Sequence, residues 1–157
     1  MKRETITAGP LALTLEWEDG EIGALELGWS KGLRTSAALS DTARSLKQAL
    51  ERYVRGEAVR WPELPLALGR VSPFTRQVLE VLTREVPAGA TLTYGELAAR
   101  CGRPKAARAV GRAMAANRWP LVLPCHRVLG ANGALTGYSN PAGLDLKRFL
   151  LELEGAL

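Results

Sequence analysis

The chain has 157 residues, 46% of them hydrophobic, and a formal net charge of +5 at pH 7. This length and composition fit one or two small domains with a hydrophobic core, and they exclude a disordered or fibrous chain. Two cysteines are too few for a disulfide framework, and a single histidine leaves no cluster of metal-ligand spacing, so we expect no structural metal and no cofactor.

The N-terminal end, Met1 to Thr5, lacks the apolar segment of a signal peptide, and no run of residues approaches membrane-spanning length. We therefore expect a cytoplasmic protein that does not contact a membrane. In that reducing compartment both thiols would stay free.

Alternating apolar residues predict a β-hairpin near the start of the chain. The alternation begins at Ile6 and continues on both sides of Asp19-Gly20, a dipeptide that favours a tight turn. Gly23 shifts the alternation and predicts a β-bulge. A helix capped by Ser40 or Asp41 and running to about residue 55 is expected to follow the hairpin.

A stretch with prolines and no periodicity, residues 57–71, predicts a linker between two domains. We expect a β-rich structural domain with the linker over residues 1–70, and a mainly helical domain over residues 71–157. The second domain begins with a helix, because Ser72 supplies an N-cap and Pro73 fits the first helical position.

Two short helices are predicted next, residues 93–102 and residues 105–117, with a glycine turn between them. This is a DNA-binding arrangement. The second helix lacks the set of Asn, Gln or several Arg that reads base edges, and its alanines suit close approach to a DNA backbone or the narrow minor groove. An alanine-rich core helix is the alternative, which would explain the alanines but not Arg108 and Arg112.

Positive charge is concentrated in residues 91–120. This segment has six basic residues and one acidic residue, so its net charge of +5 equals that of the whole chain. Such a bias is typical of a nucleic-acid partner. A weaker bias would indicate only a solvated charged face.

One potentially reactive side chain, that of Cys125, follows an apolar run. Cys125 comes after residues 121–124, for which we predict a short buried strand that ends in a turn and holds the thiol at the rim of a pocket. His126 and Arg127 could favour the thiolate, which is the nucleophilic form. The alternative is a core cysteine, because cysteine is among the most buried residue types.

Cys125 and His126 are adjacent in sequence, which suits a bridging water better than the direct contact used by cysteine hydrolases. An acid on the far side of the imidazole would fix its tautomer and support its positive charge. Glu154, which follows a final helix predicted over about residues 144–152, is the candidate acid.

The run 124–128 (PCHRV) is preceded by Asn117 and by residues 104–111 (PKAARAVG), and it is followed by residues 137–139 (GYS). In this order and spacing, the motifs resemble those of the O6-alkylguanine-DNA alkyltransferases over about residues 74–155. The resemblance implies an α/β (α+β) fold: a small RNase H-like first domain of β-hairpin and helix, and a mainly helical second domain with a winged-helix-like helix-turn-helix.

The resemblance also implies direct DNA repair by a methylated-DNA-protein-cysteine S-methyltransferase that acts once. Cys125 would accept the alkyl group from O6-alkylguanine after the base is flipped out of duplex DNA. His126, through a water, and Glu154 would activate the thiol. Asn117 would support the turn before Cys125, and Tyr94 would assist the leaving guanine at N3.

Further residues are assigned by the same resemblance. Val128, Tyr138 and Ser139 would contact the base or line the alkyl pocket, and Arg108 would fill the space of the flipped nucleotide. The implied DNA-binding residues are Lys105, Ala106, Ala107, Arg108, Ala109, Arg112 and Arg127. The partner would be double-stranded DNA, bound through its minor groove by a monomer.

Residues 140–143 depart from the family's pattern and add bulk beside the alkyl pocket. Three other functions stay open: a non-enzymatic alkyltransferase-like protein that binds lesions but lacks the acceptor cysteine, a transcription regulator, and a cysteine hydrolase. The presence of Cys125 argues against the first. The poor base-reading set of the second helix argues against the regulator, and the absence of a separated base argues against the hydrolase.

Overall fold

A computed structural model describes residues 2–157, which form two units that meet in sequence at residues 67 and 68. The described part of the first unit holds a three-stranded sheet and one α-helix, whereas the second holds four α-helices and a two-stranded sheet. The predicted mixed α and β class is thus confirmed. Within residues 2–157, every helix is too short or too polar to span a bilayer.

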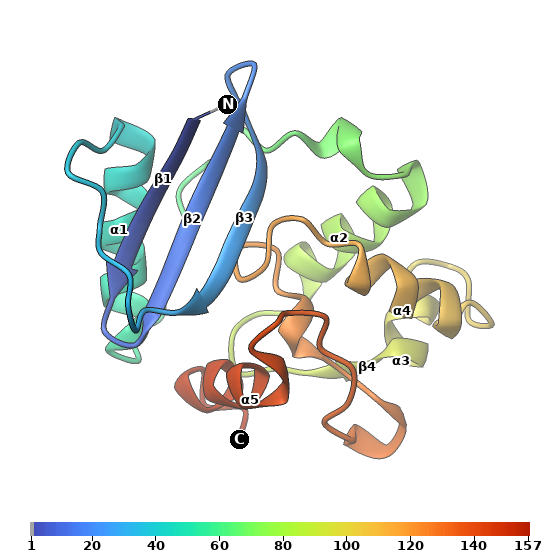
Figure 1. Ribbon diagram of the computed structural model, residues 1–157. Helices are drawn as coiled ribbons and strands as arrows, with labels where there is room; N and C mark the ends of the chain where they lie inside the picture. The colour runs from blue at the N-terminus through green and yellow to red at the C-terminus, as the bar shows by residue number, and fades with distance from the viewer. Residues whose placement is uncertain (1) are drawn as a thin grey trace. The chain divides into compact units, whose positions relative to one another are not determined.

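The sheet of the first unit is antiparallel. Strands β1 (Lys2–Ala8), β2 (Leu11–Glu18) and β3 (Glu21–Trp29) pair in that order (Figure 1). The predicted hairpin is β2–β3, and Asp19 and Gly20 in its turn have φ angles of 51° and 79°. Positive φ at both positions is what a two-residue type I′ turn requires, so the dipeptide acts as predicted.

Two details of this sheet bear on the sequence prediction. The ladder shifts register opposite Glu16 and Trp17, and Gly23 is the extra residue of this bulge, as predicted. Strand β1 makes a second hairpin that was not predicted, because the alternation is recognisable only from Ile6 onward. Glu4 hides the earlier part of the pattern, since it occupies an inward position where an apolar residue would be expected and is only 1% exposed.

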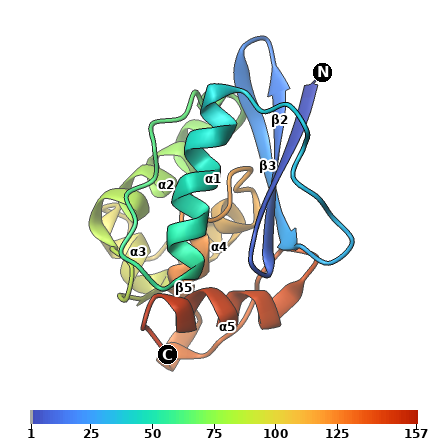
Figure 2. The ribbon, with the colours of Figure 1, turned by 90° about the vertical axis from the view of Figure 1, so that its left-hand side faces the viewer.

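Helix α1 (Asp41–Val54) lies against one face of the sheet (Figure 2). Ser40 is its N-cap, as predicted, and its hydroxyl accepts a hydrogen bond from the Ala43 amide at 3.1 Å. The Glu4 carboxylate accepts hydrogen bonds from the Ser40 amide and hydroxyl and from the Trp17 indole. These bonds connect β1, β2 and the start of α1, and they satisfy a buried charge.

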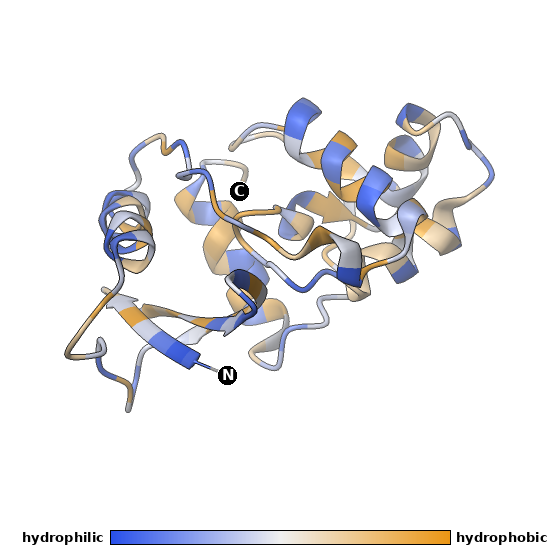
Figure 3. Ribbon diagram, turned by 90° about the horizontal axis from the view of Figure 1, so that it is seen from above, coloured by the Kyte–Doolittle hydropathy of each residue, from blue (hydrophilic) through white to orange (hydrophobic). Residues whose placement is uncertain are grey.

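Four α-helices form the framework of the second unit. They are α2 (Pro73–Glu85), α3 (Tyr94–Arg100), α4 (Ala107–Ala115) and α5 (Gly143–Leu153). Ser72 caps α2, as predicted. Thr93, the residue near which the next helix was expected to begin, caps α3, and Glu96 completes a capping box with it. Hydrophilic and hydrophobic segments alternate along the helices, as expected when each has one apolar face (Figure 3).

Helix α4 is shorter than predicted at both ends. It begins at Ala107 rather than about residue 105, because Ala106 has non-helical dihedral angles and its amide closes a turn on the Arg103 carbonyl at 2.9 Å. Lys105 therefore lies in the turn before the helix.

A two-stranded parallel sheet joins distant parts of the second unit. Strand β4 (Leu92–Thr93) pairs with β5 (Val128–Leu129). Tyr94 follows β4 directly, and a 3₁₀ turn, η2 (Cys125–Arg127), directly precedes β5. This pairing brings the start of α3 beside the candidate nucleophile.

The strand predicted before Cys125 does not form. Leu121 has a φ of 76°, and the Leu123 amide donates to the Trp119 carbonyl at 3.0 Å, so the run folds into a turn. The Asn117 side chain donates to the Leu123 carbonyl at 2.9 Å and accepts from the Trp119 amide at 3.0 Å. An apolar run was mistaken for a strand because an upstream side chain supplies the backbone hydrogen bonds that a neighbouring strand would otherwise provide.

Candidate active site

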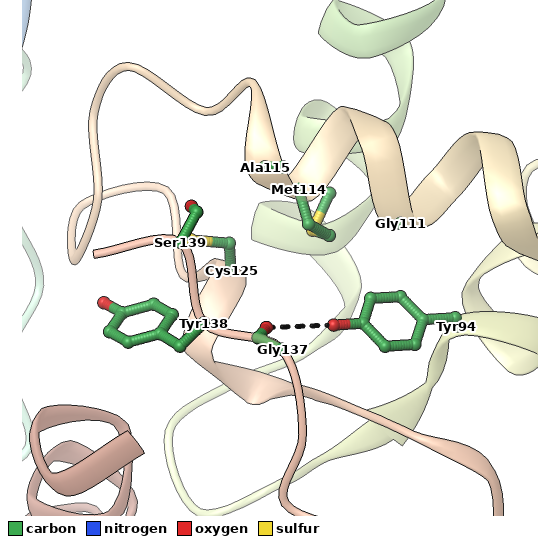
Figure 4. Close-up of a pocket in the computed structure, with 8 residues that line it drawn as sticks. All are labelled: Tyr94, Gly111, Met114, Ala115, Cys125, Gly137, Tyr138 and Ser139. Atoms are coloured by element: carbon green, nitrogen blue, oxygen red, sulfur yellow. Dashed lines mark hydrogen bonds between the residues drawn. The ribbon is translucent and has the colours of Figure 1, made fainter. Parts of the chain in front are cut away.

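A pocket of about 260 Å³ has Cys125 in its wall (Figure 4). Helix α4 contributes Gly111, Met114 and Ala115 to the lining, and the segment 137–139 lies on the other side of the thiol. Tyr94 completes the lining. Helix α4 and the candidate nucleophile Cys125 therefore line the same cavity.

Cys125 is buried, with 7% of its surface exposed. Burial raises its pKa, whereas the side chain of Asn117 and the charge of Lys147 act in the opposite direction. Since burial outweighs them, the group rests as a thiol and needs a base to become nucleophilic.

The two residues after Cys125, His126 and Arg127, belong to a buried hydrogen-bond network with Glu154. Glu154 accepts hydrogen bonds from His126 Nε2 at 2.7 Å and from Arg127 Nε at 2.8 Å, and its side chain is 1% exposed. Burial by itself raises the pKa of Glu154, but the hydrogen bonds and charges of His126 and Arg127 outweigh it and bring the pKa to about 2. Glu154 is therefore ionised at neutral pH.

The ionised carboxylate decides the tautomer of His126. Because a carboxylate only accepts hydrogen bonds, Nε2 of His126 carries the proton that Glu154 receives. Burial lowers the pKa of His126, although Glu154 partly opposes it, so the ring is neutral at rest. Its Nδ1 is buried and has no hydrogen-bond partner among residues 2–157. This nitrogen carries a free lone pair and can accept a proton.

Arg127 is a correction to the sequence prediction. Its side chain is buried, and it donates to Glu154 and, through Nη1, to the Val86 carbonyl at 2.8 Å. A guanidinium held in this way cannot reach a phosphate. It serves as a fixed counter-ion of Glu154 instead, a role that depends on contacts with segments distant in sequence.

Two tyrosines flank the thiol (Figure 4). The Tyr94 hydroxyl donates to the Gly137 carbonyl at 3.3 Å. Burial and, to a smaller extent, the charge of Cys125 raise the pKa of Tyr94. Burial also raises the pKa of Tyr138, whose buried hydroxyl has no partner among the described residues. Both phenols therefore stay protonated and can act as hydrogen-bond donors. Ser139 is exposed beside them at the pocket wall.

Helix α4 has one buried and one exposed face. Val110, Ala113 and Met114 are buried, while Arg108 and Arg112 are exposed. Lys105 is also exposed, and three alanines around the helix start are half-buried: Ala106, Ala107 and Ala109. Alanines on both faces and arginines on the outer one do not fit the alternative of a core helix.

Lys147 is a residue of the site that the sequence prediction missed. It lies in α5 with no exposed surface, and its Nζ donates to the Val128 carbonyl at 2.7 Å and to the Thr136 carbonyl at 3.0 Å. The available signal was its position between Leu146 and Leu150 on the apolar stripe of the helix. Phe149 and Leu153, apolar residues of the same helix, are only half-buried.

The site defines a class of protein: one that presents a basic, DNA-binding type of helix beside a buried cysteine with its own base. Residues 73–156 match the DNA-binding domain of 6-O-methylguanine DNA methyltransferase. This match covers more than half of the chain, and the chain belongs to this family.

Individual relatives agree with this assignment. The methylated-DNA-protein-cysteine methyltransferase of Methanosarcina acetivorans is 47% identical over 113 residues, which are 72% of this chain and 69% of that protein. The enzyme of the same name from Salmonella typhimurium is 46% identical over 112 residues, 71% of this chain but only 63% of that protein. The crystal structure of Mycobacterium tuberculosis OGT in complex with DNA is 35% identical, with a TM-score of 0.74, and the match covers 96% of this chain and 91% of that one.

Proposed function

We propose that this protein is a methylated-DNA-protein-cysteine methyltransferase, which repairs DNA by moving the alkyl group of O6-alkylguanine onto Cys125. The observation that carries the proposal is the shared pocket, because Cys125 and three residues of the basic helix α4 line the same cavity. Membership of the family and the likeness to a relative crystallised with DNA support it.

The reaction is an in-line displacement at the alkyl carbon. Nδ1 of His126 takes the proton of the Cys125 thiol, with a water as bridge, and Glu154 stabilises the imidazolium through Nε2. The thiolate forms an S–C bond as the C–O6 bond breaks, and the electron pair of that bond stays on guanine. The proton lost by the thiol balances the one that guanine gains. No step returns the free thiol, so each molecule reacts once.

Other pocket groups act on the guanine. The Tyr94 hydroxyl is a protonated donor and would hydrogen-bond to N3, which makes guanine a better leaving group. The Ser139 amide would face O6, and the carbonyls of Cys125 and Val128 would hold the exocyclic amine. The Val128 carbonyl already accepts from Lys147, so it would use its second lone pair.

The base must leave the duplex to reach this pocket, at a cost of a few kcal/mol. Arg108, exposed on α4, would occupy the vacated space, and the small residues around it would let the helix enter the minor groove. Arg112 and Lys105 would contact phosphates. We propose that the protein works as a monomer in the cytoplasm, on the nucleoid, where the substrate lies and the thiol stays reduced.

The proposal is tested by incubating the protein with duplex DNA that contains one O6-methylguanine and weighing the intact protein. We expect a gain of one methyl group and none with Cys125→Ser, whereas Cys101→Ser, the matched control, should still gain it. Binding of the damaged duplex without any gain in mass would contradict methyl transfer and favour a lesion-binding protein.

A further inference from the structure

The turn that follows helix α2 holds a glycine in close contact with the backbone of Glu154. Ala90 donates to the Pro87 carbonyl at 3.1 Å, which closes a β-turn, and Gly89 at the third position of this turn has a φ of 91°. A type II turn requires a positive φ there, which favours glycine. A Cβ on Gly89 would also lie only 3.1 Å from the Glu154 carbonyl oxygen. The second constraint has no part in forming the turn.

This close contact is not a general feature of the turns in the chain. Among residues 2–157, a Cβ would meet nothing within 4 Å at seven other glycines with positive φ, which are Gly20, Gly32, Gly56, Gly102, Gly133, Gly143 and Gly155. At Gly89 the nearest atom belongs to the backbone, which cannot rotate away as the end of a side chain can. A Cβ there must displace the backbone of Glu154 by a few tenths of an ångström.

The same turn also contacts the second partner of Glu154. The Val86 carbonyl, three positions before Gly89, accepts from Arg127 Nη1 at 2.8 Å, and Nε of the same arginine donates to Glu154 at 2.8 Å. One short segment, residues 86–89, thus holds Arg127 and also touches the backbone of Glu154.

The side chain of Glu154 has little freedom to compensate for a displaced backbone. One carboxylate oxygen accepts from His126 at 2.7 Å and the other accepts from Arg127, and the side chain is 1% exposed. Because both oxygens are engaged in an enclosed space, a shift of the backbone must lengthen at least one of these hydrogen bonds. The position of Gly89 therefore bears on the orientation of His126.

We propose that Gly89 is a positioning residue for the alkyl transfer: it lets the backbone of Glu154 approach the turn after α2, so that the carboxylate holds His126 with Nδ1 free for the thiol proton. The role in catalysis rests on the proposed function. The orientation of His126 exists without DNA, so the two can fail separately.

The first test uses the single histidine of the chain as an NMR probe without DNA. With isotope-labelled histidine, the Nε2 proton of His126 should be seen in slow exchange with water, because Glu154 accepts it in a buried site. Gly89→Ala should speed this exchange severalfold. Gly56→Ala is the matched control, since Gly56 has a φ of 81° and open space around it, and it should leave the signal unchanged.

The second test separates transfer from binding. At saturating methylated duplex, Gly89→Ala should slow methyl transfer about fivefold, since misplacement by a full ångström costs about a hundredfold. Its affinity for the duplex should stay the same, because the turn changes the acid and not the DNA-binding helix. Gly56→Ala should change neither quantity.

A second substitution covers the case in which Gly89→Ala does not fold. Gly89→Asn keeps the added Cβ, and asparagine adopts a positive φ more readily than alanine; Gly56→Asn is then the control. A histidine signal equal to that of the control would overturn the proposal, and so would an equal transfer rate. Should the unchanged protein itself transfer no methyl group, a changed histidine signal would still support the positioning of His126, and only the proposed function would be lost.

Discussion

The two cysteines of this protein share burial but not surroundings. Burial raises the pKa of both thiols. Cys101, at the end of α3, has Glu85 beside it, whose charge raises the pKa further, and it does not line the pocket. Cys125 has a neutral histidine with a free nitrogen, the Asn117 side chain and a buried ammonium. A buried cysteine therefore becomes a nucleophile through its neighbours, whereas burial alone makes it inert.

Removing His126, the proposed general base, should remove most of the difference in reactivity between Cys125 and Cys101. In His126→Gln we expect methyl transfer to Cys125 to slow by about a hundredfold or more, because the thiol proton loses its acceptor. The measurement is single-turnover transfer from methylated duplex. Labelling of Cys101 should stay the same, and an unchanged transfer rate would show that the thiol is activated by other means.

Acid should weaken the surroundings of Cys125. The folded pKa of Glu154 is about 2 against an ordinary value of 4.5, so its contribution to stability is present above pH 4.5 and is lost as the pH falls toward 2. The shift corresponds to a few kcal/mol of unfolding free energy. Denaturant unfolding at pH 6 and pH 3 should show a loss that is smaller in Glu154→Gln; an identical loss in both proteins would contradict this role.

The turn before Cys125 offers a smaller test. Asn117→Ala removes the partners of the Leu123 carbonyl and the Trp119 amide, so we expect a loss of roughly 1–3 kcal/mol in unfolding free energy and slower transfer. Gln48→Ala removes an exposed amide from α1 and is the matched control. Stability equal to that of the control would mean that water replaces Asn117 without cost.

The smallest effect is expected for Arg108, the residue proposed to enter the duplex. Arg108→Ala should slow repair of duplex DNA about tenfold, since part of the flipping cost is no longer offset, and it should leave the reaction with free O6-methylguanine base unchanged. Arg148→Ala, an exposed arginine on another helix, is the control. Equal losses on both substrates would refute the assignment of Arg108.

Local signals made much of the fold predictable. Ser40, Ser72 and Thr93 each cap a helix that begins where the sequence indicates, and Asp19-Gly20 closes the predicted hairpin. These features depend on a few neighbouring residues, so the chain around each one is enough to recognise it.

The missed features depend on contacts between distant segments. The turn at Leu121 is held by Asn117, and the burial of Arg127 depends on Val86 and Glu154. In the sequence, Lys147 has the features of an ordinary helix residue, and only its contact with β5 shows its role. The motif around Cys125 predicted a nucleophile and its acid, but it could not indicate a buried ammonium 22 positions later in the chain.

The most direct test of the account is to locate the methyl group after a reaction with excess methylated duplex. Peptide mass spectrometry should find one methyl group per molecule, on Cys125, with Cys101 unmodified and no second turnover. Methyl groups shared between Cys101 and Cys125, or absent from both, would contradict the claim that the surroundings of Cys125 make it the single acceptor.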